Sequence, residues 1–138
     1  MTEADPYELG LILATGEVER LYSALSVLVS TAADGGRCAV LVSWRALALM
    51  LEPDLARHSQ EPEATPTLAW AGREAFGRSL AELREAALAL DGLEFWACSA
   101  SVETMALSAA DVEERLDGVM STPRFLRRVR DARRLIHV

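Results

Sequence analysis

Two short continuous apolar runs, separated by one amphipathic segment, most constrain what this chain can fold into. The runs are residues 9–14 (Leu-Gly-Leu-Ile-Leu-Ala) and 38–43 (Cys-Ala-Val-Leu-Val-Ser). Strands covered on both faces have continuous apolar sequences, so both runs are predicted to be buried parallel strands. Between them, apolar residues recur at the spacing of one helix face: Val18, Leu21, Tyr22, Leu25, Leu28, Val29 and Ala32. The segment is therefore predicted to be one right-handed βαβ unit, whose helix ends at Asp34-Gly35-Gly36.

The rest of the chain continues the alternation of helices and strands. Helices are predicted over residues 45–51, 79–90 (opened by the capping box Ser79-Leu-Ala-Glu82), from 108, and 124–133. Strands are predicted at 93–97, 118–120 and 135–138, and residues 54–66 are predicted to be a loop. The pattern predicts an α/β fold, a three-layer sandwich of about five mainly parallel strands with helices on both faces. Residues 1–138 are expected to form a single domain.

Composition narrows the class of partner. The chain has 14 basic residues, all arginine, against 21 acidic ones, for a formal charge of −7, and 51% of its residues are hydrophobic. An acidic balance disfavours nucleic acid and anionic membrane surfaces. No apolar stretch approaches the ~20 residues that span a bilayer, and the acidic start of the chain does not resemble a signal peptide. We therefore expect a cytoplasmic protein without nucleic-acid or membrane partners.

The two cysteines are expected to lie at opposite edges of the sheet. Cys38 opens a predicted strand, whereas Cys98 follows one directly. Residues that far apart cannot form a disulfide, which needs Cα atoms within about 7 Å. In parallel α/β sheets, ligands and chemistry gather at the carboxyl ends of the strands, where Cys98 lies. Cys38 is accordingly interpreted as structural.

Cys98 is the candidate reactive residue. It stands at a strand-to-helix junction, where free backbone N–H groups and the positive end of a helix stabilise a thiolate. Ser99 and Ser101 are candidate hydroxyl donors, and Arg45, at the end of the neighbouring strand, is a candidate positive charge. The alternative is an inert, partly buried thiol, because free cysteine is among the most buried residue types.

Other candidate sites are weaker. Thr15-Gly16 before a helix is similar to a phosphate-binding loop, but the acidic Glu17 and Glu19 oppose an anion there. His58 with Asp54, Glu61 and Glu63 matches no metal-ligand spacing, so no metal and no cofactor are expected. His137 is interpreted as a core histidine. The arginines from 124 to 134 fit a solvated helix face or an acidic partner.

Three further stretches are informative: residues 10–16 (Gly-Leu-Ile-Leu-Ala-Thr-Gly), 39–47 (Ala-Val-Leu-Val-Ser-Trp-Arg-Ala-Leu) and 95–107 (Phe-Trp-Ala-Cys-Ser-Ala-Ser-Val-Glu-Thr-Met-Ala-Leu). Together they resemble the DsrE/DsrF-like family. The third is the most specific, because it is similar to the family's Ala-Cys-Ser-x-Ser motif followed by Met-x-Leu. The resemblance implies a DsrE-like fold, assembly into trimers or hexamers, and a cytoplasmic sulfur-relay function in which Cys98 carries sulfane sulfur as a persulfide.

The leading hypothesis is therefore a sulfur carrier or sulfurtransferase-like protein whose partners are sulfur donor and acceptor proteins. The alternative is a non-catalytic oligomeric scaffold or small-ligand-binding protein in which Cys98 takes no part. Assembly into oligomers is also consistent with the aromatic residues Trp44, Trp70 and Phe76, which lie near predicted loops, since aromatic residues are enriched in interface cores.

Overall fold

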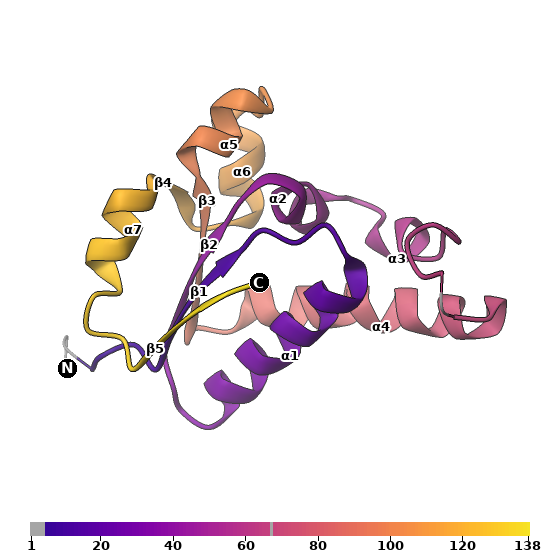
Figure 1. Ribbon diagram of the computed structural model, residues 1–138, viewed down its shortest axis with the longest axis horizontal. Coiled ribbons are helices and arrows are strands. Elements are labelled where there is room, and N and C mark those ends of the chain that lie inside the picture. The colour runs from indigo at the N-terminus through magenta and orange to yellow at the C-terminus, as the bar shows by residue number, and fades with distance from the viewer. Residues whose placement is uncertain (1–4, 67) are drawn as a thin grey trace.

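The computed structural model describes residues 5–66 and 68–138, which form one parallel sheet with helices around it (Figure 1). The strand order is β4-β3-β2-β1-β5, and every pairing is parallel. The α/β sandwich expected from the sequence is thus confirmed. The elements in chain order are β1 (Leu9–Leu13), α1 (Val18–Ala33), β2 (Cys38–Val42), α2 (Trp44–Leu51), α3 (Leu55–His58), α4 (Trp70–Ala89), β3 (Leu93–Cys98), α5 (Ser99–Thr104), α6 (Ala109–Arg115), β4 (Gly118–Met120), α7 (Thr122–Arg128) and β5 (Arg134–His137).

The order of the strands explains why the two faces of the sheet are covered unequally. From β1 to β4 the chain steps in one direction, and right-handed crossovers therefore place the intervening helices on one face. Only the return from β4 to β5, on the other side of β1, runs over the second face, and it carries α7 (Figure 1). The large core lies between the sheet and α1, α2, α4 and α6, whereas a smaller cluster lies beneath α7.

Burial along the strands follows this asymmetry. All five residues of β2 are buried, as its continuous apolar sequence predicts. In β3, the residues facing the large core are buried, whereas Glu94 and Trp96 on the α7 face are half-buried. Because α7 is only seven residues long, it buries only a small cluster on its face of the sheet, and Glu94 and Trp96 remain partly open to solvent.

β5 contradicts one expectation from the sequence. His137, interpreted as a core histidine, is exposed, and so are the other residues of β5. The cause is topological, because β5 is an edge strand on the side of β1 where helical cover is thin. Leu135 and Ile136 consequently remain 54% and 38% exposed.

The segment between α2 and β3 also differs from the prediction. Helix α4 begins at Trp70 rather than residue 79, so the predicted capping box is wrong and Ser79 lies inside the helix, its hydroxyl 3.1 Å from that of Tyr22. The predicted loop contains the short helix α3, whose N-cap is Asp54. Gly77 makes this packing possible, because a β-carbon there would collide with the carbonyl oxygen of Ala56. The close approach of α3 to Gly77 of α4 therefore depends on a residue without a side chain.

Candidate functional site

The structure places Cys98 at the carboxyl edge of the sheet, on the face covered by α7. It is the last residue of β3 and the N-cap of α5, and it pairs with Met120 of β4. Cys98 is 5% exposed and belongs to the small cluster beneath α7. Cys38 lies at the opposite edge and in the opposite core, so the predicted separation of the two thiols is confirmed.

Hydrogen-bond donors converge on the Cys98 sulfur. Burial alone raises the pKa of this thiol, because a thiolate loses its hydration. The backbone N–H and the hydroxyl of Ser101, the backbone N–H of Ala100 and the hydroxyl of Thr122 oppose burial, and the resulting pKa of Cys98 lies below its usual value. Thr122 is the first residue of α7 and is exposed, so the thiol lies directly beneath the surface at that point.

A strained turn holds Ser101 in place. The backbone N–H of Trp44 donates to the Ser101 Oγ atom at 3.0 Å, and Trp44 has a φ of 48°. A non-glycine residue in this region costs about 1–3 kcal/mol and persists where the surroundings impose it. With one lone pair of Ser101 engaged by Trp44, its hydroxyl hydrogen is free to point at Cys98. The donors form a chain whose members polarise one another.

Glu94 holds the helix that carries Thr122. Its carboxylate accepts hydrogen bonds from Arg128 Nε (2.9 Å), Tyr7 Oη (2.6 Å) and Trp96 Nε1 (3.0 Å). Burial raises the pKa of Glu94, but these donors outweigh burial and lower it below its usual value. The bonds from Arg128 tie α7 to β3. They thereby fix the position of Thr122, at the other end of the helix, beside the Cys98 sulfur.

Cys38 lies in the opposite electrostatic setting. It is fully buried, and burial together with the negative charge of Glu8 raises the pKa of its thiol to about 11. About one Cys38 side chain in ten thousand is therefore ionised at pH 7. Since the thiolate is the nucleophile, Cys98 is the more favourable nucleophile of the two.

Removing the Ser101 hydroxyl tests this arrangement. Ser101→Ala is expected to raise the pKa of Cys98 and to move the midpoint of its alkylation-rate profile to higher pH. A hydrogen bond to a charged group contributes about 1.5 kcal/mol, roughly tenfold in thiolate population. The higher nucleophilicity of a more basic thiolate offsets part of that loss, so iodoacetamide should react about threefold more slowly at pH 7. Ser99→Ala is the matched control, and an equal change there would contradict the role of Ser101.

The structure brings together part of the set expected from the sequence. Ser101 is fully buried against Cys98 and donates to it twice. Ser99 is half-buried as the first residue of α5. Sequence reasoning expected free backbone N–H groups at this junction, and that of Ala100 is one of them, but it missed the roles of Thr122 and Trp44. A signal for Thr122 existed, because Ser121-Thr122 follows the carboxyl end of β4, the strand beside β3.

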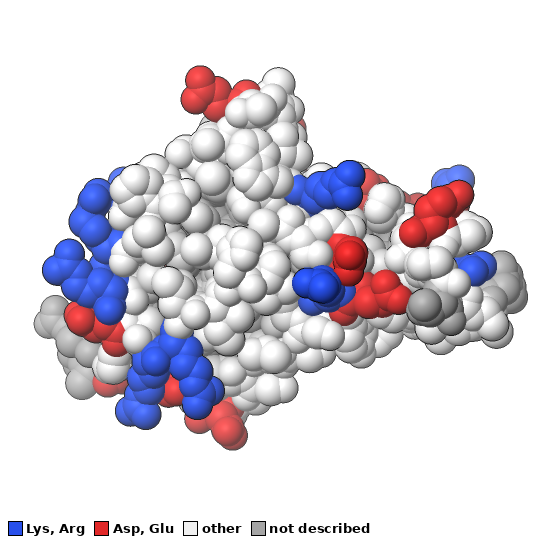
Figure 2. Space-filling view, viewed as in Figure 1, with Lys and Arg blue, Asp and Glu red and all other residues white. Residues whose placement is uncertain are grey.

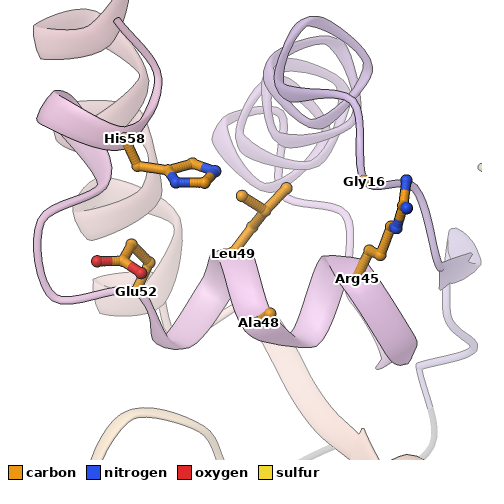
Figure 3. A pocket seen from close by; sticks show the side chains of 6 residues that line it. All are labelled: Gly16, Arg45, Ala48, Leu49, Glu52 and His58. Carbon is orange, nitrogen blue, oxygen red and sulfur yellow. The ribbon is translucent and has the colours of Figure 1, made fainter. Parts of the chain in front are cut away.

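Arg45 belongs to a separate cavity of about 310 Å³, lined by Gly16, Arg45, Ala48, Leu49, Glu52 and His58. Figure 3 shows Arg45 extending toward Gly16 at one end, with His58 and Glu52 at the other and Leu49 between them. A β-carbon at Gly16 would lie 2.9 Å from the Arg45 Cβ atom, so the absence of a side chain there gives Arg45 its place.

The structure also shows the surroundings of the other candidate sites, the loop at Thr15 and the possible metal ligands. The Thr15 hydroxyl accepts the backbone N–H of Glu17, and the Glu17 carboxylate pairs with Arg20 at 3.0 Å. Within residues 5–66 and 68–138, no three His, Cys, Asp or Glu side chains are grouped so that they could hold a metal ion.

No helix in the same two ranges is long and apolar enough to span a membrane. Comparison of the chain with protein-family models and with curated proteins finds no match.

Proposed function

We propose that the protein is a sulfur carrier that holds sulfane sulfur as a persulfide on Cys98. One observation supports this most directly: of the two thiols, only Cys98 has a lowered pKa, and it lies where parallel sheets place their chemistry. The expected setting is the cytoplasm, where thiols stay reduced. Donor and acceptor are then proteins that bring a persulfide or a thiol to the surface beside Thr122.

The reaction is sulfur transfer between thiols. The Cys98 thiolate attacks the outer sulfur of a donor persulfide, the donor S–S bond breaks, and the donor leaves as a thiolate with the bonding electron pair. Cys98 then carries the S–S bond. In the second step an acceptor thiolate attacks the outer sulfur, and the Cys98 thiolate leaves. The donors from Ser101, Ala100 and Thr122 stabilise Cys98 as nucleophile in the first step and as leaving group in the second.

Peptide mapping after sulfur loading tests the proposal. The full-length protein is treated with inorganic polysulfide at pH 7, its thiols and persulfides are alkylated, and it is digested with trypsin. Cleavage after arginine places Cys98 in the peptide 85–115 and Cys38 in the peptide 38–45. We expect the mass of one extra sulfur atom on the first peptide. Extra sulfur on neither peptide, or equally on both, would contradict the proposal.

The small-ligand-binding alternative has one observation in its favour. The Arg45 cavity of about 310 Å³ is close in size to small-molecule pockets and lies at the carboxyl edge of the sheet. In this alternative Cys98 takes no part, so the peptide 85–115 stays unmodified while a ligand protects Arg45 from phenylglyoxal. The two experiments together separate the two functions.

An oligomeric state belongs to the same proposal. Trp44, Leu135 and Ile136 are 45%, 54% and 38% exposed, and β5 is an edge strand with unpaired backbone groups. Contact with further copies would cover such a surface. Phe76 is half-buried, and the side chain of Trp70 lies outside the described residues.

Light scattering at micromolar concentration is therefore expected to give three or six times the chain mass of 15.0 kDa. Leu135→Glu is expected to lower that mass, because it places a charge in the middle of the apolar edge. A mass of 15.0 kDa for the unmodified protein would show that it is a monomer.

A further inference from the structure

Positive charge is concentrated in one segment of an acidic chain. Residues 124–134 contain six of the 14 basic side chains and a single acidic one, although the whole protein carries a formal charge of −7. Figure 2 shows basic side chains gathered over α7 and the start of β5, beside a broad uncharged area. Charge asymmetry of this size indicates a surface that binds a partner, rather than charges spread evenly over the protein to keep it soluble.

Only part of this charge is needed to hold the fold together. Arg128 binds Glu94, and Arg133 approaches Glu8 at 3.7 Å. The guanidinium groups of Arg124, Arg127 and Arg130 are exposed and have no carboxylate partner in the described part of the chain.

An apolar side chain interrupts the basic ones. Leu126, between Arg124 and Arg127, is 42% exposed. We call Arg124, Leu126, Arg127 and Arg130 the α7 basic surface. A leucine surrounded by arginines resembles a protein interface, which combines apolar contact with a polar rim.

The α7 basic surface begins next to the reactive thiol. Thr122, whose hydroxyl donates to Cys98, is the first residue of α7, and Arg124 and Arg127 follow within the next two turns. At 1.5 Å per residue, the span from Thr122 to Arg127 is about 7.5 Å along the helix axis. A macromolecule seated on α7 therefore lies close enough to reach the surface above Cys98.

We propose that the α7 basic surface docks the acidic face of a partner protein that exchanges sulfur with Cys98. The inference rests on the proposed function and names the chemistry of its partner. A nucleic acid is disfavoured, because the patch is one short helix on a protein of net negative charge and phosphate backbones need broad neutralisation. An acidic protein face needs only local complementarity, which steers the encounter and raises the association rate.

Charged thiol-reactive peptides test the proposal. The probes are Glu-Glu-Cys-Glu-Glu and Lys-Lys-Cys-Lys-Lys, each with its cysteine in a disulfide with 2-thiopyridine. The Cys98 thiolate attacks the peptide sulfur, the S–S bond to the pyridine breaks, and pyridine-2-thiolate leaves with the electron pair, takes up a proton and is measured by its absorbance. The full-length protein is used at about 20 mM and about 500 mM salt, because the higher concentration screens charge beyond a few ångströms.

We expect the acidic peptide to react about tenfold faster than the basic one at low salt, with the ratio approaching one at high salt. The result is diagnostic, since a uniformly charged protein of −7 would favour the basic peptide. The double variant Arg124→Glu/Arg127→Glu should reverse the preference. The matched control Arg20→Glu/Arg57→Glu makes the same change in net charge, on α1 and α3, and should still react faster with the acidic peptide.

Two further measurements separate the possible failures. Neutral iodoacetamide reports whether Cys98 reacts at all, so an unreactive thiol would overturn the proposed function itself. Normal alkylation without a preference for the acidic peptide would overturn the docking surface alone. The unmodified protein is also tested for binding to a fluorescent oligothymidine. If it binds, and the binding is lost in Arg124→Glu/Arg127→Glu, the surface is assigned to nucleic acid and the proposed protein docking surface is overturned.

Discussion

Cys98→Ser is expected to abolish persulfide loading completely, whereas Cys38→Ser should load one sulfur atom as the unmodified protein does. A serine hydroxyl is not a nucleophile at neutral pH without a base to activate it, so no slow residual reaction is expected at position 98. At position 38 the thiol does not compete for sulfur, because its pKa of about 11 leaves it almost entirely protonated. Intact-protein mass after exposure to polysulfide at pH 7 measures both variants.

The two variants should also differ in stability. Cys38 is fully buried in the large core, where a serine hydroxyl without a partner costs about 1–3 kcal/mol. Cys98 already sits among hydrogen-bond donors, so a serine hydroxyl in its place would keep partners and cost less. Urea denaturation should therefore show a larger loss of stability for Cys38→Ser than for Cys98→Ser. Sulfur loading that survives Cys98→Ser and is lost in Cys38→Ser would reverse the assignment of the two thiols.

Arg84→Ala is expected to destabilise the fold by several kcal/mol, because each buried carbonyl that loses its hydrogen-bond partner costs about 1–3 kcal/mol. Arg84 is 3% exposed in α4, and its guanidinium donates to the carbonyl oxygens of Leu49 (2.9 Å) and Glu52 (2.7 Å). These carbonyls belong to the last turn and C-cap of α2, which a helix leaves without internal partners. Alanine would leave them unpaired and open a cavity.

The free energy of unfolding in urea measures the effect. Arg84→Lys should recover only part of the loss, because an ammonium cannot reproduce the planar fork of a guanidinium. Arg78→Ala, in the same helix but exposed and paired with Glu74, is the control and should change stability by less than about 1 kcal/mol. A loss equal to that control would show that α2 does not depend on Arg84.

Arg84 also shows what sequence reasoning could not foresee. In the sequence it is one arginine within an amphipathic helix, and such residues are mostly exposed. Its burial arises because its long side chain reaches from α4 to the C-terminal end of α2, where the guanidinium donates to carbonyls more than 30 positions away in the chain. The pairing follows from helix packing, which no local pattern encodes.

The residues of the candidate site likewise fall into those that the sequence predicts and those that only the fold brings together. Cys98 and Ser101 could be predicted, because a cysteine directly after an apolar strand and a serine three residues later lie close together in any strand-to-helix junction. The roles of Thr122 and Trp44 were not predicted, because Thr122 reaches Cys98 only through the pairing of β4 with β3, and Trp44 reaches Ser101 only through the turn after β2. Arg45 follows a neighbouring strand as predicted, but its side chain lines the cavity beside Gly16.

The sequence by itself determined the class of fold. The continuous apolar runs of β1 and β2 and the helical spacing between them allow one buried parallel arrangement, since burial on both faces and the handedness of the crossover are local consequences of side-chain pattern and backbone chirality. Tertiary structure alone decided which face each thiol occupies. Cys98 became the more acidic thiol and Cys38 the less acidic one because hydrogen-bond donors from two separate segments, α5 and α7, meet at one sulfur and core packing surrounds the other.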